Sequence, residues 1–177
     1  MQHIEADGNE YWADENEEYH RDDDLPAIVL ADGTKQWFQH GKRHRDGDKH
    51  AVEFPDGMLV WYQLGQIHRD VDKPATVCSD GMKAWYQLGQ IHRDGDKPAI
   101  VCSDGTKVWY QYNKIHRDND LPAVEYADGT KMWAQHGKFY RDGDKPVIEC
   151  PNGHKFFVHG NFLDVIEHIA PAPELTE

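Results

Sequence analysis

Long apolar runs are missing from this sequence: no window approaches the ~20 apolar residues that a membrane-spanning helix needs. The first five residues also lack the basic stretch and following apolar run of a secretory signal. We therefore expect a soluble, cytoplasmic protein with no membrane insertion. With 177 residues, the chain is long enough to bury a core without disulfides or metal ions.

Cysteine is scarce as well. The three cysteines, Cys78, Cys102 and Cys150, stand 24 and 48 residues apart. Their odd number and the lack of any Cys-x-x-Cys pair argue against a disulfide framework and against a zinc site. We expect them to be small apolar core residues, and we expect no metal and no cofactor.

An excess of positive charge is also lacking, since the formal net charge is −13. Residues 5–24 hold ten acidic side chains and one arginine, and residues 161–177 hold four acids and no Lys or Arg. Residues 25–160 are neutral, with 18 charges of each sign. Because proteins that bind nucleic acids usually present a basic surface, we expect no direct nucleic-acid binding.

What the sequence does contain is a 24-residue period. The triplet His-Arg-Asp starts at His20, His44, His68, His92 and His116, and Tyr140 starts a sixth, variant copy. A fixed period of this kind indicates a repeat array. We interpret residues 1–24 as an acidic, degenerate N-terminal capping repeat with one inserted residue, and residues 25–160 as the regular repeats.

Each unit has the pattern of a β-hairpin, because two apolar runs flank an Asp-Gly or similar turn. The seven turn glycines are Gly8, Gly33, Gly57, Gly81, Gly105, Gly129 and Gly153. Pro55 and Pro151 each precede such a turn pair. A two-residue type I′ turn needs a backbone N–H where these prolines stand. We therefore predict a three-residue loop with a left-handed glycine, which pairs position 54 with position 58.

This register decides which side chains share a face. The face predicted to be buried carries Val52, Phe54, Met58, Val60 and Tyr62, and the opposite face carries Ala51, Glu53, Leu59, Trp61 and Gln63. On the opposite face each tryptophan stands across from an alanine. The resulting stripe consists of Trp37, Trp61, Trp85, Trp109 and Trp133. It is either a candidate partner-binding surface or the second core layer of a thin sheet.

The segments between hairpins, such as residues 89–98, are too long for a tight turn and carry most of the charge. We predict a structural role for their histidines and arginines, with each arginine bridging to a carboxylate of a neighbouring repeat. These residues are His44, Arg45, His68, Arg69, His92, Arg93, His116 and Arg117.

Some of these segments invite a catalytic or metal-binding interpretation. Residues 116–121 resemble the His-Arg-Asp catalytic loop of protein kinases, but a catalytic loop occurs once and this triplet occurs five times. Asp-x-Asp pairs such as Asp94 and Asp96 are candidates for calcium binding, although basic residues flank them and no bidentate glutamate follows. His40 and His44 form a pair at metal-ligand spacing. We expect structural roles for all of these residues, and no enzyme activity.

The repeat ends after Gly160. The apolar residues of 161–169 have helical spacing, and Asn161 is a suitable N-cap. We predict a short helix over residues 161–169 that caps the open edge of the last hairpin. Residues 170–177 are expected to be a disordered tail.

The segment Trp-Tyr-Gln-Leu-Gly-Gln-Ile-His-Arg-Asp occurs identically at 61–70 and 85–94. Together with the Asp-Gly turn, it resembles MORN-type repeats, and it is most similar to the divergent MORN-like units of bacterial, phage and giant-virus proteins, including the YwqK-type antitoxin family. The paired glycines of the familiar MORN pattern are replaced here by His-Arg-Asp, so lipid binding does not carry over. The resemblance implies hairpins packed side by side as a scaffold or binding surface, without a common catalytic chemistry.

We thus expect an all-β array of seven 24-residue hairpin repeats that form an elongated, twisted meander sheet with a short C-terminal capping helix. The expected function is a non-catalytic protein-interaction or scaffold module. A protein partner would bind the sheet face or the acidic N-terminal end, where the candidate residues are Asp14, Glu15, Glu17 and Glu18. The alternative is an acidic inhibitor, of a phage anti-defence or antitoxin-like kind, that occludes a nucleic-acid-binding or nucleotide-sensing enzyme. Two partly apolar faces are also compatible with a homodimer.

Overall fold

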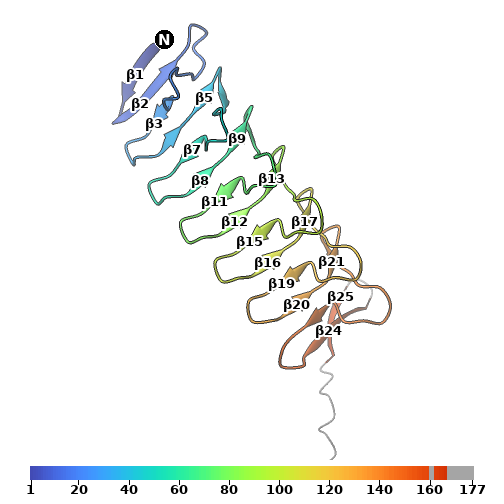
Figure 1. Ribbon diagram of the computed structural model, residues 1–177. Coiled ribbons are helices and arrows are strands. Elements are labelled where there is room, and N and C mark those ends of the chain that lie inside the picture. The colour runs from blue at the N-terminus through green and yellow to red at the C-terminus, as the bar shows by residue number, and fades with distance from the viewer. Residues whose placement is uncertain (160–161, 167–177) are drawn as a thin grey trace, which may run out of the picture.

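A computed structural model describes residues 1–159 and 162–166 of the chain. In this part of the chain the fold is all-β and contains no helix, so there is no helix that could cross a membrane. Fifteen strands form one antiparallel sheet in which each strand pairs with the next one along the row. The row is elongated, and successive repeats lie side by side from the N-terminal end onward (Figure 1). The expected all-β meander is confirmed.

The strands of the regular repeats are short. The long sheet consists of β1 (Gln2–Ala6), β2 (Asn9–Ala13), β3 (Ile28–Val29), β4 (Lys35–Gln36), β7 (Val52–Glu53), β8 (Leu59–Val60), β11 (Thr76–Val77), β12 (Lys83–Ala84), β15 (Ile100–Val101), β16 (Lys107–Val108), β19 (Val124–Glu125), β20 (Lys131–Met132), β23 (Ile148–Glu149), β24 (Lys155–His159) and β25 (Phe162–Ile166). Only β1, β2, β24 and β25, at the two ends of the described array, reach five residues.

The predicted hairpin register is present. Val52 pairs with Val60, the Phe54 N–H donates to the Met58 carbonyl at 2.9 Å, and the Gly57 N–H donates back to the Phe54 carbonyl at 3.0 Å. Gly57 has a φ of 88°, which is the left-handed conformation that the third loop position requires. The prolines therefore did identify a three-residue loop.

Each regular repeat also contains a second, smaller hairpin that follows its tryptophan. These hairpins are β5 (Phe38–Gln39) with β6 (Lys42–Arg43), β9 (Tyr62–Gln63) with β10 (Gln66–Ile67), β13 (Tyr86–Gln87) with β14 (Gln90–Ile91), β17 (Tyr110–Gln111) with β18 (Lys114–Ile115), and β21 (Ala134–Gln135) with β22 (Lys138–Phe139). In β13–β14 the two-residue turn is Leu88-Gly89, with φ values of 48° and 78°. The expectation that residues 89–98 form only a long connection is wrong, because a tight type I′-like turn here begins with leucine instead of asparagine.

Alanines and tryptophans form the most buried part of the array. Ala27, Ala51, Ala75, Ala99 and Ala123 are fully buried, and each stands directly before the first strand of a hairpin. The face predicted to be buried also packs well at its centre, where Val52 and Val60 are about 5% exposed or less. Both faces of the thin sheet therefore carry core residues.

The predicted C-terminal helix is wrong over residues 162–166. These residues form β25, which pairs with β24. Phe162 lies opposite His159 at one end of the pairing, and Ile166 lies opposite Lys155 at the other. Over so few residues the apolar spacing fits a helix and a strand equally well. The strand has the advantage that it forms hydrogen bonds with the backbone groups at the edge of β24. Residues 161 and 167–169 of the expected helix, and the expected tail at 170–177, lie outside the described residues.

The N-terminal repeat departs from the others in its loop. Ala13 and Tyr19 form a bridge that encloses residues 14–18, whereas Phe38 and Arg43 enclose four residues at the equivalent place. The insertion expected from the sequence thus lies in this acidic loop. It brings a carboxylate-rich segment next to the turn of the first small hairpin.

Candidate functional site

Charged side chains of successive repeats are joined in an inter-repeat ladder. In its central step, Arg93 donates from Nε and Nη2 to the two carboxylate oxygens of Asp72, at 2.6 and 3.2 Å, and Lys97 donates to the same carboxylate at 2.6 Å. The carboxylates that accept from the Nε of the next repeat's arginine are Asp24, Asp48, Asp72, Asp96 and Asp120, and all of them except Asp96 also accept from a lysine. Each one belongs to the repeat before its arginine, as the sequence suggested.

The tryptophans lie beneath the arginines of this ladder. The Arg93 guanidinium is 3.8 Å from the ring centroid of Trp85, and the Trp85 indole N–H donates to the Asp72 carbonyl at 3.1 Å. Trp37, Trp61, Trp85, Trp109 and Trp133 are only 5–8% exposed. The tryptophans therefore lie in a second core layer of the sheet, which is one of the two interpretations of the stripe given above. Because their rings are covered, we do not retain them as partner-contact residues.

The ladder favours the charged form of Asp48 and of Asp72. Hydrogen bonds from Arg69, and then from Lys73, lower the pKa of Asp48 to about 2. Arg93 and Lys97 do the same for Asp72, whose pKa is also about 2. A carboxylate with two cationic partners has few free lone pairs for a metal ion.

The other aspartate of each Asp-x-Asp pair also has protein partners. Asp70 accepts from the Gln63 amide at 2.7 Å and lies 2.9 Å from His68 Nε2. Its neighbour in the pair, Asp72, points into the ladder. The two carboxylates of a pair therefore serve different contacts, which leaves little support for calcium binding by these loops.

The histidines of the triplets connect each loop to the next small hairpin. His68 Nδ1 accepts the backbone N–H of Leu88 at 3.3 Å, so its Nε2 carries the proton and donates to Asp70. His92 stacks on Tyr112 with 4.2 Å between ring centroids. His92 and His116 are each about 5% exposed. Every side chain of the triplet is thus engaged within the array.

Hollows between successive loops are lined by these same residues. One of them is bordered by His92, Arg93, Asp96 and Trp109; there Asp96 binds Arg117, and His92 Nε2 lies 3.0 Å from Asp94. Among the described residues we find no nucleophile activated by a neighbouring base in these hollows. The charged contacts of these hollows join successive loops.

An exposed apolar strip runs along the turns of the small hairpins. Leu64, Leu88 and Tyr112 are 70%, 68% and 59% exposed, and they occupy the first turn position of consecutive hairpins. We call these three residues the tip ridge. The hairpins are kept in register because each donates a backbone N–H to the one before, as from Gly89 to the Ile67 carbonyl at 2.9 Å. Sequence reasoning missed this ridge, although the 24-residue spacing of Leu64 and Leu88 was visible.

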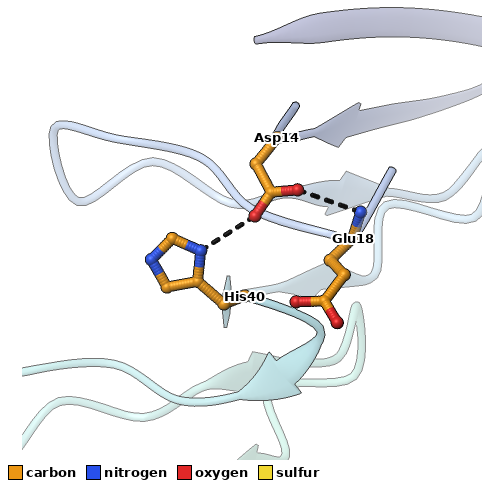
Figure 2. Close-up of side chains that lie close together, drawn as sticks. All are labelled: Asp14, Glu18 and His40. Atoms are coloured by element: carbon orange, nitrogen blue, oxygen red, sulfur yellow. Dashed lines mark hydrogen bonds and ion pairs between the residues drawn. The ribbon is translucent and has the colours of Figure 1, made fainter. Parts of the chain in front are cut away.

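The acidic loop of the N-terminal repeat lies beside the first small hairpin (Figure 2). Asp14 Oδ2 is 2.8 Å from His40 Nδ1, and the other Asp14 oxygen accepts the backbone N–H groups of Asn16 and Glu18 at 2.9 and 3.1 Å. The hydrogen bond from His40 lowers the pKa of Asp14 most strongly. Glu15 and Glu17 are exposed and form no ion pair with a described lysine or arginine.

Comparisons of the chain with protein-family models, with curated proteins and with solved structures each gave no match. The fold by itself therefore defines the class, which is an all-β array of hairpin repeats joined by an arginine–aspartate ladder. The resemblance to MORN-type repeats stays a prediction.

Proposed function

We propose that this chain is a non-catalytic, MORN-like repeat module that binds a protein partner along the tip ridge. The observation that carries the proposal is the alignment of Leu64, Leu88 and Tyr112, three large apolar side chains that are each more than half exposed. Large apolar side chains exposed at the same position of consecutive repeats are typical of an interaction site.

The turn geometry strengthens this argument. Leu64, Leu88 and Tyr112 have φ values of 50°, 48° and 47°, in the left-handed region. A residue with a Cβ atom is unfavourable there by roughly 1–2 kcal/mol, and asparagine is the usual choice before glycine in such a turn. Large apolar residues at these positions do not help the turn, so we assign them to binding.

The charge distribution favours a protein partner over a nucleic acid. The regular repeats contain equal numbers of acidic and basic residues, and the ladder pairs many of them internally. Electrostatic attraction to phosphates is therefore weak along the ridge. A partner with a complementary apolar strip fits the surface best.

The double variant Leu64→Asn/Leu88→Asn tests the proposal. Asparagine suits the left-handed turn position, so the variant is expected to fold at least as stably as the wild type while it loses the apolar surface. Capture from host lysate, read by quantitative mass spectrometry, should show a protein that the wild type retains and the variant loses at least ten-fold. Val71→Asn is the matched control, because Val71 is 82% exposed and left-handed but lies outside the ridge. Equal capture by the wild type and the double variant would contradict binding at the ridge.

The acidic end supports a second candidate, the inhibitor that occludes an enzyme. Glu15 and Glu17 supply exposed charge without a described basic partner. The variant Glu15→Gln/Glu17→Gln separates the two ideas in the same capture experiment. If it loses the partner and the ridge variant retains it, the acidic end is the binding site.

A further inference from the structure

Three metal-ligating groups converge at the N-terminal end of the array. The ligand atoms of Asp14, Glu18 and His40 all lie within 4.8 Å of one another, and no other described residues form such a group of three. Figure 2 shows that Asp14 and Glu18 come from the inserted acidic loop, whereas His40 comes from the turn between β5 and β6. Two segments that are distant in sequence thus meet at one point.

We propose that Asp14, Glu18 and His40 bind a divalent transition-metal ion of the Zn²⁺ type. One imidazole nitrogen with two carboxylate oxygens is a donor set that suits zinc and its neighbours. Calcium needs six to eight oxygen ligands and magnesium prefers oxygen alone, so neither fits three ligands of which one is an imidazole. Water would complete the coordination. This proposal goes beyond the proposed partner binding and does not depend on it.

The distances are close to those that a bound ion requires. A zinc ion lies about 2.0–2.2 Å from its nitrogen and oxygen ligands, which places neighbouring ligand atoms about 3 Å apart. Asp14 Oδ2 and His40 Nδ1 are 2.8 Å apart, within hydrogen-bonding distance. On binding, Nδ1 of a neutral His40 releases its hydrogen to solvent and Nε2 takes one up, so the imidazole stays neutral and its Nδ1 lone pair coordinates the ion beside Asp14 Oδ2.

Separate contacts hold the three ligands in place. The second Asp14 oxygen is fixed by the backbone N–H groups of the loop, and the His40 ring stacks on His20 with 4.4 Å between centroids. Glu18 lies over Gly41, where an added Cβ atom would meet the Glu18 Cδ atom at 3.4 Å. Ligands that are already oriented by neighbouring groups lose less conformational freedom when an ion binds.

The site has a clear consequence for the array. An ion held by these residues would join the N-terminal capping repeat to the first regular repeat, and it would offset part of the acidic excess of residues 5–24. We expect zinc to raise the melting temperature, because it binds the folded state and not the unfolded chain.

The test is titration of the full chain with ZnCl₂ by isothermal calorimetry, with CaCl₂ and MgCl₂ in parallel. We expect one strongest zinc site, at least ten-fold weaker binding in His40→Gln and in Glu18→Gln, and no binding of calcium or magnesium at this site. His136→Gln is the matched control, since His136 occupies the same turn position and also stacks on a triplet histidine, His116. The His40 side chain is 69% exposed, so its replacement is not expected to unfold the protein.

A second measurement distinguishes zinc binding at this site from zinc binding at other surface histidines. Hydrogen exchange should show that zinc slows the backbone amides of residues 14–18 in the wild type, and that this protection is lost in Glu18→Gln. The proposal is overturned if His40→Gln binds zinc as tightly as the wild type, if His136→Gln loses as much affinity, or if zinc leaves exchange in residues 14–18 unchanged.

Discussion

At the scale of single residues, Val71 occupies a backbone conformation that its side chain disfavours. Its φ is 62°, and it is 82% exposed, so no buried contact of the side chain offsets the backbone strain. The equivalent positions in other repeats hold Asp23, Gly47, Gly95, Asn119 and Gly143, which are residues that tolerate the left-handed region.

Replacement of Val71 by asparagine should therefore stabilise the protein. We expect Val71→Asn to raise the free energy of unfolding by about 1 kcal/mol, because asparagine is not β-branched and its short polar side chain can hydrogen-bond locally in the left-handed region. Urea denaturation followed by tryptophan fluorescence measures the change. Val71→Ala, which lacks the polar side chain of asparagine, should gain less, and an unchanged or lower midpoint for Val71→Asn would show that the strain is not significant.

At the scale of the elements, each loop is fastened to the previous one by its ladder step. The Asp72 carboxylate receives two donors from Arg93 and one from Lys97, and its backbone carbonyl receives the indole N–H of Trp85. One aspartate thus connects a charged pair, a cation–π contact and a buried indole, so the ladder and the core layer support the same repeat interface.

The ladder predicts a specific pH dependence. The pKa of Asp72 in the folded state, about 2, is below the value of ~3.9 for an unfolded chain. A lowered folded-state pKa means that the ionised carboxylate stabilises the fold. This contribution is complete above the unfolded pKa and is lost as the pH falls through the folded pKa. The stability difference between the wild type and Asp72→Asn should thus be largest above about pH 5 and should vanish near pH 2.

Urea midpoints of both proteins between pH 7 and pH 2 provide the measurement. Asp56→Asn is the control, because Asp56 Oδ1 accepts the Met58 backbone N–H, a role that an asparagine side chain also fills. The control should differ little from the wild type at any pH. A difference for Asp72→Asn that is constant with pH would show that its charge does not stabilise the fold.

The sequence was informative where one residue excludes a geometry, and less so where several geometries fit. Pro55 lacks an N–H, so it established the hairpin register and both faces of the sheet. Leu88-Gly89 has no residue that demands a tight turn, so the small hairpins and the tip ridge were not predicted. The partners of the Asp14 carboxylate could not be foreseen either, because His40 approaches it only through the packing of two neighbouring repeats.

At the scale of the whole molecule, the array is held together by contacts of fixed sequence separation. The ladder arginine lies 21 residues and the ladder lysine 25 residues after their aspartate, and the indole N–H bonds to a carbonyl 13 residues earlier. The arginine and indole contacts recur from Asp24 to Asp120, whereas Asp96 lacks the lysine contact because Leu121 stands at that position. In such quasi-one-dimensional proteins, stability is approximately a sum over repeats and their interfaces.

Removal of one complete period should consequently leave a folded, shorter array. Deletion of residues 73–96 joins Asp72 to Lys97, so that Lys97 takes the place of Lys73 as a partner of Asp48, and Arg117 takes the place of Arg93 as the partner of Asp72. We expect a cooperative melting transition at a somewhat lower temperature than in the full chain, and a far-ultraviolet spectrum of the same type. Deletion of only residues 61–72 is the control, because it removes Trp61, Arg69 and Asp72 and leaves Asp48 without an arginine at the ladder spacing, which should split the array into two parts that unfold independently. If both deletions behaved alike, the 24-residue spacing of the ladder would not be what holds the repeats together.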